Sequence, residues 1–182
     1  PHAKLIRLTS RRLVRLEGDL SPSEMQDAVD CASGCQALLC HAVVWEYERD
    51  TSAFIELMKT YLETYPRTGS VAVRPMKHEG KMTDVSSREL ARKIGGILSS
   101  QGNSIDLESP LHRLGMVLDA SAGIIACGWM VVGGDDSDGI TSRRATDRPF
   151  FKPVSLDPRL ARLAVNVASG PRGKGATLDL MT

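Results

Sequence analysis

The sequence has 182 residues, of which 42% are hydrophobic and 25% charged, and its formal net charge is +1. These values are ordinary for a globular protein, and the length allows one large domain or two small ones. No apolar run reaches the length of a membrane span, and the N-terminus lacks the apolar core of a signal peptide. We therefore expect a cytoplasmic protein without a membrane partner.

Positive charge is concentrated near the C-terminal end. Eight Lys or Arg residues and only two acids, Asp147 and Asp157, lie between Arg143 and Lys174. Such local basic density suits a polyanionic partner even when the whole chain is nearly neutral. A solvated basic linker is the alternative interpretation.

The four cysteines are Cys31, Cys35, Cys40 and Cys127, and His41 follows the third. Their spacing differs from that of common zinc sites, in which two close pairs are separated by a longer segment. We predict no metal site. Reduced buried thiols are favoured over a disulfide, and the redox state of the cysteines stays open.

Residues 1–49 show a strand–strand–helix–strand pattern. Residues 3–9 and 12–19 alternate partly between apolar and basic side chains, as short strands do. Ser21 and Glu24 form a capping box that begins a helix, and the apolar residues 37–47 predict another strand. This order resembles a ferredoxin-like unit without its first strand and helix.

The next segment combines helices and strands around a core. A helix that begins after Asp50 or Thr51 carries an apolar stripe typical of a core-facing surface, and residues 70–77 predict a strand. Ser86 begins a second amphipathic helix, with Glu89 completing a capping box. Residues 112–120 and 123–132 then predict a hairpin.

Gly95 and Gly96 lie inside the second of these helices. Each glycine destabilises a helix interior by about 1 kcal/mol relative to alanine. Either close packing against a neighbouring backbone or the close approach of a phosphate would explain them.

A Gly-, Asp- and Ser-rich segment begins at Gly133 and predicts a linker over residues 133–156. Asp157 and Pro158 then begin a helix whose inner face should carry Leu160, Leu163, Ala164 and Val167. The apolar residues 176–182 predict a strand with Asp179 near its end.

The stretch RPFFKPVSLDPRLARLAVNVASG, from Arg148 to Gly170, followed by ATLDLMT, resembles a known family. It is similar to the interdomain junction of archaeal tRNA guanine-N2 methyltransferases that act on guanine 10. The elements from Thr51 to Val132 resemble a THUMP domain, a tRNA-binding module. The resemblance is specific in Arg148–Ala168 and diffuse elsewhere.

The resemblance implies an α+β chain with four parts. Residues 1–49 would be a truncated ferredoxin-like unit, 50–132 a THUMP domain and 133–156 a linker. Residues 157–182 would be the first helix and strand of a truncated Rossmann-like methyltransferase domain. The parent protein would be an archaeal-type tRNA-modifying enzyme that uses S-adenosylmethionine.

Two departures weaken the case for catalysis by this chain alone. Leu180 and Thr182 stand where the family has Pro and Cys, and the Gly-rich turn that would cradle the cofactor does not follow. Asp179 would be only a vestigial cofactor contact. No nucleophile–base arrangement is evident, so we expect no catalytic residues, no bound cofactor and no methyl transfer by this piece.

RNA binding is the function that remains. Lys and Arg contacts to phosphates supply most non-specific affinity for nucleic acids. By resemblance, the module would grip the acceptor end of tRNA. The candidate contacts are Arg74, Lys77, Lys81, Arg88, Arg92, Lys93, Arg143, Arg144, Arg148 and Lys152.

Two alternatives stay open. The chain could be a stand-alone α+β adaptor that binds proteins, or the RNA-binding part of another THUMP enzyme, such as a thiouridine or pseudouridine synthase. The sequence leaves the target nucleotide, apart from the resemblance, and the oligomeric state undetermined.

Overall fold

The computed structural model describes residues 4–7, 10–32, 34–35, 37–48, 50–78, 80, 82–133 and 156–169. The chain divides into two compact units. The first contains Pro1–Leu20 and Leu39–Met130, and the second contains Ser21–Leu38 and Val131–Thr182.

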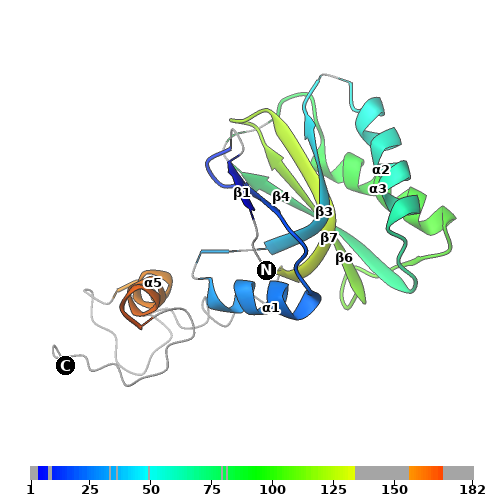
Figure 1. Ribbon diagram of the computed structural model, residues 1–182. Helices are drawn as coiled ribbons and strands as arrows, with labels where there is room; N and C mark the ends of the chain where they lie inside the picture. The colour runs from blue at the N-terminus through cyan, green and yellow to red at the C-terminus, as the bar shows by residue number, and fades with distance from the viewer. Residues whose placement is uncertain are drawn as a thin grey trace. The chain divides into compact units, whose positions relative to one another are not determined.

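A mixed five-stranded sheet forms the body of the first unit (Figure 1). Its strands lie in the order β3-β7-β6-β4-β5. β4 is parallel to β5 and to β6, whereas β6 and β7 form the antiparallel hairpin that the sequence predicts. The strand bounds are Ala37–Glu46 (β3), Ser70–His78 (β4), Ser104–Ile105 (β5), His112–Asp119 (β6) and Ile124–Gly133 (β7).

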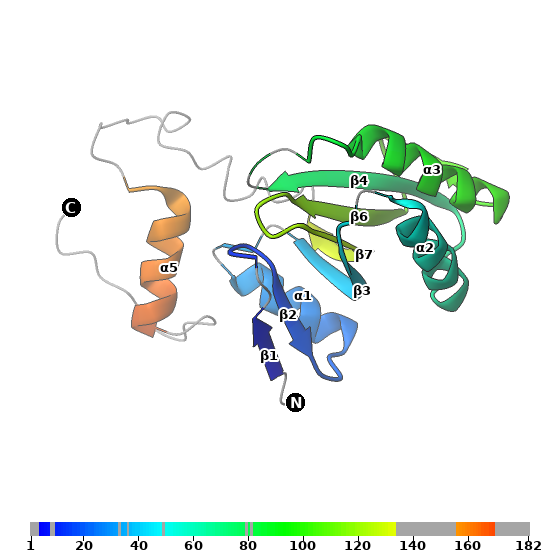
Figure 2. The same cartoon turned by 90° about the horizontal axis from the view of Figure 1, so that it is seen from above.

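Two helices, α2 (Ser52–Thr64) and α3 (Ser87–Ser100), pack against this sheet and against each other (Figure 2). The apolar stripe of α2 is core, as predicted, because Phe54, Met58 and Leu62 are almost fully buried. The strands contribute alternate residues to the same core, as a period of two requires. The buried cluster is Phe54, Met58, Tyr61, Leu62, Val71, Val73, Leu90, Ile94, Leu98, Leu114, Met116, Leu118, Ile125, Cys127 and Trp129.

The N-terminal strands do not share a sheet with β3. β1 (Lys4–Arg7) and β2 (Val14–Glu17) form a separate two-stranded antiparallel sheet. The sequence placed strand 37–47 in a ferredoxin-like unit of residues 1–49, but in the structure β3 is hydrogen-bonded to the five-stranded sheet. Val43 and Trp45 of β3 pack against the core of the first unit. Burial of these apolar side chains explains why β3 pairs with β7 of the five-stranded sheet.

Two glycines in the sheet lie in closely packed surroundings. A Cβ atom at Gly128 in β7 would lie 2.8 Å from the carbonyl oxygen of Cys40, and one at Gly115 in β6 would lie 2.6 Å from Cδ2 of Leu39. The backbone of β3 therefore approaches β7 too closely for a larger residue at Gly128, whereas at Gly115 the contacts are with side chains that can shift.

The helix caps agree in part with the sequence. Asp50 accepts hydrogen bonds from the amide and hydroxyl of Ser52 and so begins α2, whereas Thr51 makes no side-chain cap. At α3, Ser86 accepts from the Glu89 amide at 3.2 Å. In a complete capping box the Glu89 carboxylate would also accept from the Ser86 amide, but here it pairs with the Lys93 ammonium at 3.5 Å.

The second unit contains α1 (Pro22–Cys31) and α5 (Pro158–Ser169). The capping box of Ser21 and Glu24 is present at α1, and Asp157 accepts from the Arg159 amide at the start of α5. The predicted inner face of α5 is not buried: Leu160, Leu163 and Val167 are exposed. The predicted strand 176–182 lies outside the described residues. So does the predicted linker 133–156, apart from Leu156 and Gly133, which is the last residue of β7 and not part of a linker.

Candidate nucleic-acid interface

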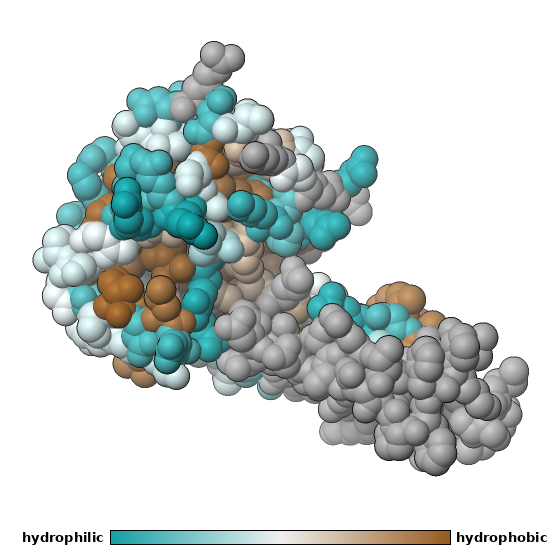
Figure 3. All heavy atoms as spheres, turned by 180° about the vertical axis from the view of Figure 1, so that it is seen from behind, coloured by the Kyte–Doolittle hydropathy of each residue, from teal (hydrophilic) through white to brown (hydrophobic). Residues whose placement is uncertain are grey.

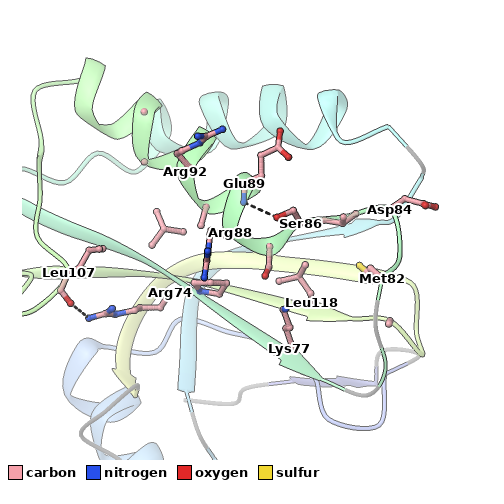
Figure 4. Close-up of a pocket in the computed structure, with 18 of the residues that line it drawn as sticks. Arg74, Lys77, Met82, Asp84, Ser86, Arg88, Glu89, Arg92, Leu107 and Leu118 are labelled. Carbon is pink, nitrogen blue, oxygen red and sulfur yellow. Dashed lines mark hydrogen bonds between the residues drawn. The ribbon is translucent and has the colours of Figure 1, made fainter.

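An open cavity of about 1510 Å³ lies in the first unit between α3, the second half of β4 and the segment after β5 (Figure 4). The local fold explains the opening. β5 pairs with β4 only at Ser70 and Val71, so this edge of β4 has no strand partner beyond them among the described residues. Unpaired edge groups and the flank of α3 therefore face the same space.

Cationic side chains converge on this cavity from two elements. β4 contributes Arg74 and Lys77, and α3 contributes Arg88 and Arg92. These side chains belong to the set that the sequence proposed for RNA contact, and the fold brings them together although up to 18 positions separate them. Two acids also line the cavity, Asp84 and Glu89, so the lining carries an excess of positive charge.

Arg74 has a structural role besides its charge. Its guanidinium donates a hydrogen bond to the carbonyl oxygen of Leu107 at 2.6 Å and so holds the segment after β5 against β4. Hydrogen bonds from the Ser109 and Glu108 amides, with a contribution from the Arg74 charge, lower the pKa of Asp106 in this segment. Since a guanidinium has five N–H donors, Arg74 can brace the segment and still contact an anion.

Lys93 differs from its neighbours on α3. It is absent from the cavity lining, and its ammonium pairs with Glu89 one turn earlier. Of the three α3 cations named from the sequence, only Arg88 and Arg92 line the cavity.

The cavity side of α3 forms one regular stripe. Arg88, Arg92, Gly95, Gly96 and Ser99 all line the space. Their spacing of four, three, one and three residues keeps them on one helical face, and the rise from the first to the last is about 16 Å. The stripe carries guanidinium groups near the helix N-terminus and exposes backbone beyond them.

The first turn of α3 adds to the positive potential. Ser86, Ser87 and Arg88 line the cavity, which places the N-terminal end of the helix at its edge. The aligned peptide dipoles leave a partial positive charge at that end, where unpaired amides favour anions.

Apolar side chains lie next to these cations. Ile105 and Leu107 line the cavity although 47% and 61% of their surfaces are exposed. Neither residue is among the candidates that the sequence suggests, because β5 has only two residues and gives no periodic signal. Figure 3 shows that apolar patches lie among hydrophilic atoms in the view from behind.

The remaining candidate residues lie outside the described part of the chain. They are Lys81, Arg143, Arg144, Arg148, Lys152 and Asp179.

The cysteines whose side chains are described, Cys35, Cys40 and Cys127, are not joined in disulfides. Burial raises the pKa of the Cys127 thiol, as expected for a neutral core residue. Within the described part of the chain, no group of three or more His, Cys, Asp or Glu side chains could hold a metal ion. No helix there is long and apolar enough to cross a bilayer.

Comparison with known proteins identifies a relative. The chain is 37% identical over 111 residues to a tRNA (guanine(10)-N2)-dimethyltransferase of Methanothermobacter thermautotrophicus. It is a partial homologue of this archaeal methyltransferase. The match covers 60% of the chain and 31% of the methyltransferase, so the chain spans about a third of that relative's length. The resemblance drawn from the sequence is confirmed at this level.

One solved structure supports the fold. The chain aligns with the crystal structure of TrmN from Thermus thermophilus at a TM-score of 0.55 and 17% identity, over 85% of this chain and 43% of TrmN. The expected α+β class is therefore confirmed, with a mixed five-stranded sheet. A 4-thiouridine synthetase solved as an RNA complex with bound ATP aligns at a TM-score of 0.45 and 16% identity, over 70% of this chain and 32% of the synthetase. No protein-family model matches the chain.

Proposed function

We propose that this chain is the tRNA-binding region of a tRNA-modifying methyltransferase, and that the cavity between α3 and β4 contacts the RNA backbone. The observation that carries the proposal is the convergence of Arg74, Lys77, Arg88 and Arg92 on one open space. Homology to a tRNA methyltransferase supports tRNA as the polyanion.

In this proposal the five-stranded sheet with α2 and α3 is a THUMP module that anchors the acceptor end of tRNA. Residues 1–49 would be the accompanying ferredoxin-like part, whose last strand, β3, pairs with the five-stranded sheet. Residues 133–156 would link the module to the start of a methyltransferase domain. The parent protein would use S-adenosylmethionine, and the module supplies position instead of chemistry. Holding a substrate in the correct geometry is itself a large part of catalysis.

The arginines on α3 suit phosphate better than lysines would. A guanidinium presents N–H donors in a planar fork that matches phosphate oxygens. No ion pair joins Lys77, Arg88 or Arg92 to a described acidic side chain, so neutralising a phosphate would break no such internal pair.

Binding of a tRNA transcript across a salt series tests this function. We expect wild-type affinity to fall steeply with salt, and an Arg88→Glu, Arg92→Glu double variant to bind at least about ten-fold more weakly, a loss of about 1.4 kcal/mol or more. Lys59→Glu on α2 is the control, because Lys59 lies outside the cavity and its ammonium pairs with the Glu56 carboxylate. Equal, weak retention of tRNA and duplex DNA by the wild type would contradict the proposal.

A further inference from the structure

The glycines of α3 differ from those of the sheet. Gly115 and Gly128 are surrounded so closely that a Cβ atom would clash. Apart from the chain neighbours and the adjacent backbone of α3 itself, a Cβ at Gly96 would meet no atom within 4 Å, and one at Gly95 would meet only Cδ1 of Ile105 at 3.9 Å, an ordinary contact. Protein packing therefore does not account for Gly95 or Gly96.

Neither glycine is required by backbone geometry. Both lie inside the regular helix α3, and neither has a positive φ. Alanine fits such a position and favours the helix. A glycine pair there therefore destabilises the helix, and neither packing nor backbone geometry requires it.

Both glycines face the cationic cavity. They lie on the same face of α3 as Arg88 and Arg92, and all four residues line the same cavity. A side chain at either position would project into the volume that a bound polyanion needs.

We infer that Gly95 and Gly96 are positioning residues of the RNA site, against which the ligand backbone lies in direct contact with the helix main chain. The inference rests on the proposed function, because it names the surface of that same cavity on which the RNA is seated. Arg88 and Arg92 bind the RNA phosphates by charge. The backbone of α3 at Gly95 and Gly96, which carries no side chain, sets how deeply the RNA enters the cavity.

Substitution separates a binding role from a structural one. Gly96→Ala should raise the thermal unfolding midpoint, since it improves helix propensity in open space, yet weaken tRNA binding. Gly96→Leu should weaken binding by about ten-fold or more, the order expected when a close contact is lost. Ser100→Leu is the matched control, because Ser100 is exposed on α3 and absent from the cavity lining.

The experiment measures the affinity of the full chain for a tRNA transcript and the unfolding midpoint of each variant. Weaker binding by Gly96→Ala with an equal or higher midpoint supports the inference, even where Gly96→Leu folds poorly. Wild-type affinity in both Gly96 variants, with loss in Arg88→Glu, Arg92→Glu, overturns the inference and leaves the proposed function standing. Absence of tRNA binding by the wild type overturns both.

Discussion

The hydroxyl of Ser10 donates a hydrogen bond to the carboxylate of Asp119, 109 residues further along the chain. Both residues are buried. The Ser10 oxygen also accepts from the amides of Arg12 and Leu13, while Asp119 accepts from Ser121 and Ala122. One hydrogen-bonded pair therefore joins the turn between β1 and β2 to the end of β6.

Ser10→Ala should lower the free energy of unfolding by about 1–3 kcal/mol, because it leaves a buried carboxylate short of a donor. Urea denaturation measures the loss, and hydrogen exchange at Arg12 and Leu13 should rise more than exchange in the core strands. Ser109→Ala is the control, since Ser109 is exposed. Equal stability of Ser10→Ala and the control would contradict this role.

Asp119 should make stability depend on pH. Burial alone raises the pKa of its carboxyl, but hydrogen bonds from Ser10, Ser121 and Ala122 outweigh burial and lower the pKa below its usual value. A depressed pKa in the folded state contributes stability above the unfolded pKa of about 3.9, and that contribution is lost as the pH falls through the folded value. Urea midpoints of Asp119→Asn and the wild type should differ at neutral pH and converge below about pH 4. A constant difference across that range would exclude this linkage.

Alanine at the sheet glycines Gly128 and Gly115 should destabilise the fold, whereas alanine at Gly96 should stabilise it. Gly128→Ala places its Cβ against a backbone carbonyl that cannot rotate away, so we expect a loss of about 1–3 kcal/mol or more in unfolding free energy. Gly115→Ala should cost less, because it meets the flexible ends of Leu39 and Met130. Thermal unfolding measures both, and a neutral Gly128→Ala would contradict the close approach of β3.

Tyr61 should tie α2 to two strands. Its hydroxyl donates to the Cys40 carbonyl at 3.0 Å and accepts from the Trp129 amide at 2.9 Å. Tyr61→Phe preserves the ring but leaves a buried amide unpaired, so we expect a loss of about 1–3 kcal/mol. Tyr65→Phe is a useful control because that side chain is partly exposed. Chemical denaturation compares the two, and equal stability would show that the hydroxyl contributes nothing.

Arg92 and Lys93 are adjacent in sequence but should differ in RNA binding. Arg92 lines the cavity, whereas Lys93 pairs with Glu89 outside it. Arg92→Gln should reduce the slope of log affinity against log salt by about 0.7–0.9, the value for one phosphate contact. Lys93→Gln should leave the slope nearly unchanged. Equal slopes in the two variants would argue against the cavity as the binding surface.

Local patterns were sufficient for most elements. The capping box at Ser21, the stripe of α2 and the β6–β7 hairpin were all readable from neighbouring residues, because caps, helix periodicity and turns depend on short-range contacts. The set of cations could likewise be drawn up from the sequence, and so could the partial homology to a tRNA methyltransferase.

Long-range pairing could not be read in this way. The sequence alone indicated most of the described helices and strands, though not β5, and which side chains carry positive charge. Only the tertiary structure decided that β3 joins the five-stranded sheet, that Arg92 faces the cavity while Lys93 does not, and that Gly95 and Gly96 border open space whereas Gly115 and Gly128 are enclosed. The physical reason is that each of these depends on atoms far away in the chain, whose positions follow from burial of a shared core and not from local preference.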